Sequence, residues 1–402
     1  MEKQRKNLLY PLSLLAFALG LALGLAVPGL FAPIAFLGDI YISLLKLIVI
    51  PLLMTEITVS VYRSAGELAS RLLKTVGLFV AMFAVSFLLT AALTALLGPG
   101  RGLALPGEAW TGELASVTLS GFFAGIFPSN IFASMAAGSI LPCILFAFVC
   151  GIAAERVRAE KAMAVAEELR RIFSRVLSYI MTLTPLGVFV LMGKAAADYG
   201  AALLGVCARY ILTAWLGCAV VTALVMILPV WLRAGIAPLT YIRRVAKVWL
   251  VTLSTCSSAA TLPTTVRVCN EEFGVPAEIT GVVVPLGCTI HMCGGAVSFC
   301  LLGLFTMQMA GVSVTLPLFL YMLLVATLMN MAAPGIPGGG IVLGATYLTI
   351  LGAPTGFIGM YSGIYRLLDM AYTTVNVTGD ITANILLAEQ EKKSIHGPEN
   401  TL

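Results

Sequence analysis

Long apolar stretches dominate the pattern of this chain. A transmembrane helix needs about 20 largely apolar residues, and stretches of that length recur along the sequence. Before residue 240 they predict six spans, at about residues 8–30, 38–62, 72–97, 115–153, 172–197 and 204–232. After residue 240 the pattern predicts two more, at about 275–309 and 356–388. The chain is therefore predicted to be an all-α membrane protein with eight transmembrane helices.

Two irregular segments precede these last two spans. The segment at about 240–272 is polar, rich in small residues and interrupted by Pro263, and the segment at about 315–353 is broken by the Gly/Pro run at 334–340. Non-helical backbone is tolerated at membrane depth only where it is buried in protein or lines a cavity. Broken segments in corresponding positions indicate the binding site of a transporter. Both are predicted to be re-entrant helical hairpins.

Basic residues predict the orientation. They precede the first span and follow the second, fourth and sixth: Lys3, Arg5, Lys6; Arg63, Arg71, Lys74; Arg156, Arg158, Lys161, Arg170, Arg171; and Arg233, Arg243, Arg244, Lys247. By the positive-inside rule, both termini are cytoplasmic. The first apolar stretch lacks a small-residue cleavage site and is predicted to be a retained span. We expect a multi-pass protein of the inner (cytoplasmic) membrane.

Composition agrees with this class. Of 402 residues, 59% are hydrophobic and 11% charged, whereas soluble domains carry about 25% charged residues. The net charge of +5 is modest and does not indicate a nucleic-acid partner. The nine Cys residues lack metal-ligand or disulfide spacing and are expected to be free, buried thiols. No cofactor is expected.

The irregular segments carry candidate chemistry. Seven hydroxyl residues crowd into positions 254–265. A hairpin tip with free amides and hydroxyls could hold a carboxylate, as helix N-termini do; the alternative is Ser/Thr bonding between packed helices. The run Ala333–Gly340 leaves main-chain groups exposed, either at a gate over the site or in a plain extramembrane loop.

Polar residues also form a stripe on the last span. Ionisable residues inside a membrane are functional candidates. Spacings of three and four place one set on a single helix face, namely Asp369, Tyr372, Thr373, Asn376 and Asp380. Such a stripe would line a cavity. Arg366 lies three residues before Asp369, so a structural ion pair between them is the alternative.

Four segments together resemble a known family. They are Ser-Ser-Ala-Ala-Thr-Leu-Pro (257–263), Pro-Leu-Gly-Cys-Thr-Ile-His-Met-Cys-Gly (285–294), Gly-Ile-Pro-Gly-Gly-Gly (335–340) and Leu-Asp-Met-Ala-Tyr-Thr-Thr-Val-Asn-Val-Thr-Gly-Asp (368–380). In this order and spacing they look like the signatures of the dicarboxylate/amino acid:cation symporters, which include glutamate transporters and neutral amino acid exchangers. The resemblance covers nearly the whole chain and is strongest from about Thr252 to Asp380.

The resemblance implies an elevator-type glutamate-transporter fold and a homotrimer surrounded by membrane lipid. A static scaffold would comprise residues 1–71 and 115–200. A mobile transport domain would comprise residues 72–114 and 201–389, and residues 390–402 would form a cytoplasmic tail.

Substrate residues carry over by position. Five residues match family positions that surround the substrate's α-carboxylate, namely Ser257, Ser258, Ala259, Gly338 and Gly339. Asp369 matches the carboxylate that binds the α-ammonium. Thr373 and Asn376 match polar side chains that touch the substrate, and Thr289 is also assigned to the site.

One position of the substrate site departs from the family. Tyr372 replaces the Arg that pairs with the side-chain carboxylate of acidic substrates, so a neutral amino acid is favoured. Arg366, about one turn away, could substitute for that Arg.

The cation site departs as well. The motif reads His291-Met292-Cys293-Gly294-Gly295 where members usually have Asn-Met-Asp-Gly-Thr. Sodium prefers oxygen ligands, by the logic that governs calcium and magnesium. The ligand positions on the third span become Phe79, Met82 and Phe83. These losses coincide, so one sodium site is predicted to be lost.

The remaining ion sites involve the same region. A second site would use Gly287, Asn376 and Asp380, with His291 in place of its Asn partner. A third relies on main-chain carbonyls around Thr289 and the second hairpin. His291 could carry a proton near Asp380, could as a charged imidazolium occupy the space of the lost cation, or could serve as a neutral, hydrogen-bonded packing residue. The coupling candidates are Gly287, His291, Cys293, Asn376, Asp380 and Arg366, and the transported cation is a proton or residual sodium; no metal site is certain.

The predicted function is secondary transport of an α-amino acid, neutral by preference, with weakened or lost sodium coupling. Alternatives are an acidic amino acid or dicarboxylate symporter and an uncoupled permease or anion conductance. An enzyme is not expected, because His291 and Cys293, at i and i+2, would lie on different helix faces. Glu56 has no family role and is predicted to be a proton-sensitive group or to pair at a trimer contact.

Overall fold

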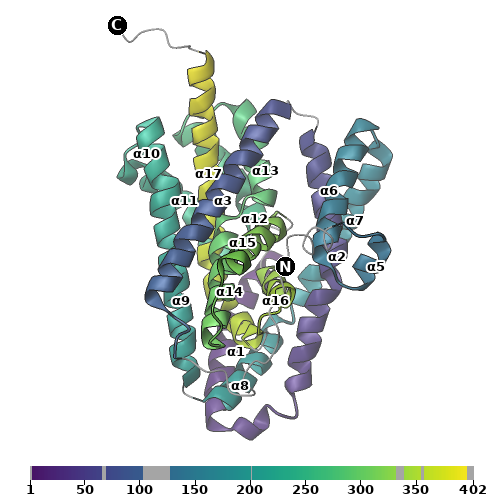
Figure 1. The fold of residues 1–402 in the computed structure, drawn as a ribbon, viewed down its shortest axis with the longest axis vertical. Helices are drawn as coiled ribbons and strands as arrows, with labels where there is room; N and C mark the ends of the chain where they lie inside the picture. Colours follow the sequence, from purple (N-terminus) through teal and green to yellow (C-terminus); the bar gives the residue numbers. More distant parts are fainter. Residues whose placement is uncertain are drawn as a thin grey trace.

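The computed structural model describes residues 2–65, 69–102, 127–200, 202–331, 339–354 and 357–395. These residues form helices and connecting turns, with no strand among them. The predicted positions 334–338, Gly338 included, and residues 103–126 lie outside the described part. The long helix α17 (Ile358–Ile395) runs through the molecule, and the other helices pack in two groups (Figure 1).

The first group contains the helices of residues 2–65 and 131–199. Helix α1 packs along α8, and α2 packs against both α6 and α7. The bounds are α1 (Glu2–Ala26), α2 (Ala35–Ala65), α5 (Ile131–Ala136), α6 (Ile140–Arg156), α7 (Glu160–Met181) and α8 (Thr184–Tyr199). Glu56 lies here, and its carboxylate pairs with Arg170 of α7 at 3.2 Å. It therefore joins two helices of the same chain.

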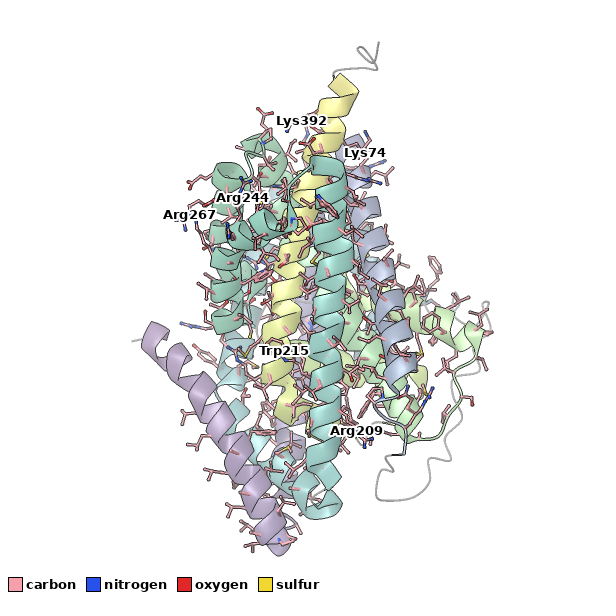
Figure 2. The ribbon with its side chains drawn as sticks, turned by 90° about the vertical axis from the view of Figure 1, so that its left-hand side faces the viewer. Lys74, Arg209, Trp215, Arg244, Arg267 and Lys392 are labelled. Carbon is pink, nitrogen blue, oxygen red and sulfur yellow. The ribbon has the colours of Figure 1, made fainter. Side chains whose placement is uncertain are left out.

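The second group surrounds α17. It contains α3 (Ala69–Leu97), α9 (Ala202–Val221), a π-helical turn (Thr222–Ile227), α10 (Leu228–Ala234), α11 (Pro238–Thr255), α12 (Ser258–Arg267), α13 (Ala277–Ile290), α14 (Cys293–Met309), α15 (Leu316–Asn330) and α16 (Gly339–Leu351). Helices α9, α11, α13 and α14 all contact α17. The indole of Trp215 on α9 donates to the carbonyl of Leu367 on α17 at 3.1 Å, on the face shown in Figure 2.

Three described helices are long and apolar enough to cross a membrane, namely Leu73–Leu97, Leu203–Ala234 and Ala277–Met309. They match the predicted third, sixth and seventh spans. The pair α7 and α8, bent by 50°, passes the same test together.

Two predicted spans are divided in the structure. The prediction of one helix over 115–153 is wrong after residue 136, because Gly138, at a φ of +73° that favours glycine, separates α5 from α6. The span at 172–197 breaks between α7 and α8, where Pro185 occupies the first turn of α8.

One smaller expectation is also corrected. Pro263 does not interrupt its segment but lies inside α12. Its ring removes one hydrogen bond, to the carbonyl of the exposed Ala259. The break falls instead at Cys256 and Ser257, where Cys256 has a φ of +48°. Helix α17 continues to Ile395, so the first residues of the predicted tail are helical.

Hydroxyl and indole groups fasten α11 to α17. Tyr241 Oη lies 2.8 Å from Thr382 Oγ1, Trp249 Nε1 donates to Thr378 Oγ1 at 2.8 Å, and the hydroxyls of Thr252 and Thr374 lie 2.8 Å apart. These contacts fix the position of α11, and so of the Cys256 turn that follows it, along α17.

We expect Y241F to lower the free energy of unfolding by about 1–2 kcal/mol, because it leaves the buried Thr382 hydroxyl without this partner. Thermal unfolding in detergent measures the effect. The control is Y179F at an exposed tyrosine, which should change stability by less than about 0.5 kcal/mol. Equal effects of the two variants would contradict the role of Tyr241.

Candidate functional site

A cavity lies where the break between α11 and α12 and the break between α13 and α14 face α17. It is lined by Cys256, Ser258, Met292, Gly295, Ser298, Phe299, Asn330, Gly340, Leu343, Tyr365, Asp369, Tyr372, Thr373 and Asn376. The elements that contribute are distant in sequence, and both irregular segments predicted from the sequence supply residues.

The α17 stripe provides the polar wall of this cavity. Asp369, Tyr372, Thr373 and Asn376 all line it, as their helical spacing predicts. Asp369 is only 7% exposed, and its Oδ1 accepts a hydrogen bond from Thr373 Oγ1 at 3.2 Å. The carboxylate is thus oriented by its own helix.

Asn376 is oriented by the neighbouring helix. Its Oδ1 accepts a hydrogen bond from the Gly294 N–H of α14 at 2.7 Å. Since the oxygen is engaged there, the Nδ2 group is the part of this cavity-lining side chain that can donate to a ligand. The Oδ1 atom of Asn376 is therefore occupied, and its Nδ2 group remains as the donor for a ligand.

Two helix N-termini also reach the cavity. Ser257 caps α12 by accepting from the Ala260 N–H at 3.2 Å, and Ser258, the first residue of α12, lines the cavity. Helix α16 begins at Gly339, and the next residue, Gly340, is also a lining residue. The first N–H groups of a helix have no partner within it and attract anions.

A buried polar chain runs behind the cavity. Asp380 Oδ1 lies 2.9 Å from His291 Nδ1, and His291 Nε2 lies 3.1 Å from Cys293 Sγ. Asp380 and His291 are each 1% exposed. With Asp380 ionised, the Nδ1–H group donates to the carboxylate, and Nε2 accepts from the thiol.

The expectation that His291 and Cys293 point apart is wrong. Helix α13 ends at Ile290 and α14 begins at Cys293, so His291 has an extended conformation, with a φ of −112° and a ψ of 101°. Helical spacing does not apply across this break, and the two side chains meet. Both are buried.

Of the three α3 positions predicted to have lost sodium ligands, Phe79 contacts this chain directly. Phe79 stacks on the His291 ring with centroids 4.3 Å apart and planes 8° apart. Met82 and Phe83 are buried on the same helix. Gly287 faces Asp380 so closely that a Cβ there would lie 2.4 Å from Oδ1. Within the described residues, no group of three or more His, Cys, Asp or Glu side chains is arranged to hold a metal ion.

Other predicted residues lie elsewhere. Thr289 is not among the lining residues; its hydroxyl lies 2.9 Å from that of Ser60 on α2. Arg366 donates to the carbonyl of Ser254, near the end of α11, at 2.9 Å, and it is also absent from the described lining. Ser257 and Ala259 flank Ser258 but do not line the cavity.

Nine of the lining residues were not named as site residues from the sequence. They are Cys256, Met292, Gly295, Ser298, Phe299, Asn330, Gly340, Leu343 and Tyr365. A signal existed for Asn330, which lies four residues before the start of the Gly/Pro-rich run at Pro334. It also existed for Tyr365, one turn before Asp369 on the polar stripe. Ser298 is already engaged, since its hydroxyl lies 2.8 Å from that of Tyr361.

Apolar helices packed around a polar cavity, with helix breaks at its edge, define a membrane transport protein. Residues 9–390 match the model of the sodium:dicarboxylate symporter family. The chain belongs to that family.

Individual relatives agree with the family match. The chain is 28% identical over 380 residues to a proton/glutamate-aspartate symporter of Escherichia coli (strain K12), covering 89% of this chain and 85% of the relative. It is also 28% identical over 405 residues to a C4-dicarboxylate transport protein of Solibacter usitatus, covering 97% and 93%. A neutral amino acid transporter B(0) of Oryctolagus cuniculus is 28% identical over 438 residues, covering 94% and 79%. All three relatives are transport proteins, and none is an enzyme.

We expect G287A to destabilise the protein by about 2–3 kcal/mol, because the added methyl would displace the buried Asp380 carboxylate from His291. Thermal unfolding measures this. The control is G281A on the same helix, where a Cβ meets no atom within 4 Å. If G287A were as stable as G281A, the close approach of Asp380 to α13 would be refuted.

Proposed function

We propose that this protein is a secondary active transporter of a neutral α-amino acid, with sodium coupling weakened or lost and with a proton carried through His291. The observation that carries the proposal is the charge of the cavity. Among its described lining residues, Asp369 is the only acidic side chain, and none is Lys or Arg. A zwitterion complements such a site, because its ammonium would meet Asp369 while its carboxylate needs only neutral donors.

The donors for that carboxylate are at hand. The N-termini of α12 and α16, the Ser258 hydroxyl and the Nδ2 group of Asn376 all border the cavity. Charge-assisted hydrogen bonds from such groups are short and strong. An α-carboxylate between these donors and an α-ammonium at Asp369 would leave the substrate side chain toward Phe299, Leu343 and Met292.

An acidic side chain would lack a partner in this cavity. Tyr372 stands where, by the family resemblance, acidic-substrate members carry an arginine. Arg366 is engaged with the Ser254 carbonyl, which argues against its replacing that arginine. A second carboxylate near Asp369 would be repelled without a cation between them. These observations favour a neutral substrate over the glutamate, aspartate and dicarboxylates named for the relatives.

The coupling proposal rests on the buried chain of Asp380, His291 and Cys293. Imidazole and thiol are poor sodium ligands, and Phe79 covers the imidazole with an apolar ring. An imidazole can carry a proton, and a proton on His291 Nδ1 would face the Asp380 carboxylate at 2.9 Å. The chemistry of this site therefore supports a proton as the driving ion.

The elevator arrangement is part of the same proposal. We assign the first group of helices to a scaffold (residues 1–71 and 115–200) and the second to a transport domain (72–114 and 201–389). Their packing supports this assignment, because it is denser within each group than between the groups. We also propose eight spans, two re-entrant hairpins and a homotrimer in the inner membrane. Lys74, Arg244, Arg267 and Lys392 lie toward the end of the molecule where α17 finishes (Figure 2), which supports a cytoplasmic C-terminus.

We expect serine or alanine to raise the thermal stability of the purified protein, with or without sodium, and aspartate and glutamate to leave it unchanged. D369N should weaken amino acid binding by at least about 100-fold, because it removes the only charge that complements the ammonium. The control is D198N, at an exposed aspartate that pairs with Lys194 on α8. Stabilisation by aspartate alone would overturn the neutral assignment.

For coupling, we expect an inside-alkaline pH gradient to drive uptake into proteoliposomes, because protons moving inward would carry the substrate with them. A sodium gradient alone should have little effect. H291N should abolish the response to the pH gradient, and H396N, at the only other histidine of the chain, should preserve it. Strict sodium dependence without a pH response would refute proton coupling.

A further inference from the structure

The break between α13 and α14 leaves a main-chain group that neither helix satisfies. His291 N–H still donates to the Gly287 carbonyl at 2.9 Å, and the Met292 carbonyl accepts from the Gly295 N–H at 2.9 Å. Met292, however, has a φ of −131° and a ψ of 81°, so its own N–H points away from the helical ladder. At membrane depth, an unpaired N–H group would cost several kcal/mol.

A side chain from another helix satisfies this group. Asn330, the last residue of α15, is 2% exposed, and its amide is oriented by its neighbours. In that orientation Nδ2 donates to the Met292 carbonyl at 3.0 Å, while Oδ1 accepts from the Met292 N–H at 3.3 Å. One amide thereby bonds both main-chain groups of Met292.

Gly295 makes room for this amide. A Cβ at position 295 would lie 2.2 Å from the terminal amide atom of Asn330, which is closer than two such atoms can approach. A threonine, the usual residue at this place in the motif that the segment resembles, would therefore collide with Asn330. Gly295 and Asn330 are sterically matched, although 35 positions separate them in the sequence.

The matched pair borders the cavity. Met292, Gly295 and Asn330 all line it, and Gly294, between Met292 and Gly295, holds Asn376 through its N–H group. Asn330 also lines a second, smaller cavity together with Phe79 and Ile290. A shift of the break would therefore move both the cavity wall and the orientation of Asn376.

We propose that Asn330 and Gly295 form a clamp that fastens the α13–α14 break to α15 and so fixes the wall of the substrate cavity. Asn330 is a positioning residue in this arrangement, acting through Met292 and Gly294. The part of the inference that concerns the substrate rests on the proposed function. The clamp itself rests only on the contacts of Met292, Gly295 and Asn330.

The test is a double-mutant cycle with N330A, G295A and the double variant. Hydrogen exchange of the peptide 287–297 in the full-length protein reports on Met292 directly. Each single variant should speed exchange of this peptide by about 10-fold or more. Because both variants break the same contact, exchange in the double variant should be no faster than in the single variant with the faster exchange. N330D, which keeps the acceptor but loses the donor, should fall between wild type and N330A.

Substrate binding gives the second readout. The amino acid that stabilises the wild type should bind at least about 10-fold more weakly to N330A and to G295A, with a higher KM and a smaller change in maximal rate. The matched control is N384A, which removes a buried asparagine that donates to Thr280 between α17 and α13. N384A should lower thermal stability without changing exchange at 287–297.

The two proposals can fail separately. Additive effects in the cycle, or unchanged exchange at 287–297 in N330A and G295A, would overturn the clamp whatever the substrate is. Faster exchange in a protein that binds only acidic substrates would keep the clamp and overturn the proposed neutral specificity. Faster exchange with unchanged affinity for the bound amino acid would overturn the positioning role of Asn330.

Discussion

Every buried backbone polar group of a membrane protein needs a partner, because no water is present at depth to supply one. Continuous helices meet this need internally, so each break requires partners from elsewhere. The turn at Cys256 is followed by the cap that Ser257 gives α12, and the Met292 break is closed by Asn330. The cavity lies where these two breaks and the groups that satisfy them come together. The irregular backbone and the site therefore have the same physical origin.

The same constraint explains the chain of Asp380, His291 and Cys293. A buried carboxylate without a partner would be strongly unfavourable, and a bound cation is one way to compensate it. In this protein a side chain compensates it, since the imidazole meets Asp380 and in turn meets the thiol. Phe79 then excludes water from the ring. The Phe at position 79 of α3 and the Cys at position 293 are mutually consistent, because both contact His291.

Sequence patterns predicted the parts of this architecture that depend on local spacing. Four of the five polar residues predicted to share one face of α17 line the cavity, whereas Asp380 lies behind it. The hydroxyl-rich segment does contain a break. The exact break was missed, because Pro263 is tolerated within α12 whereas Cys256, an unremarkable residue in sequence, adopts positive φ. The contact of His291 with Cys293 and the role of Asn330 depend on where two helices end relative to a third. Periodicity carries no information on such contacts.

The hydroxyl pair of Ser60 and Thr289 joins α2 of one helix group to α13 of the other. A neutral hydrogen bond of this kind contributes only about 1 kcal/mol to stability. Breaking a buried ion pair costs more, because it leaves an unpaired charge. The charged pair of Glu56 and Arg170, by contrast, lies one turn away on α2 and joins helices within a single group. Under the proposed elevator arrangement, sliding of one group past the other would break this hydroxyl contact and leave the Glu56–Arg170 pair intact.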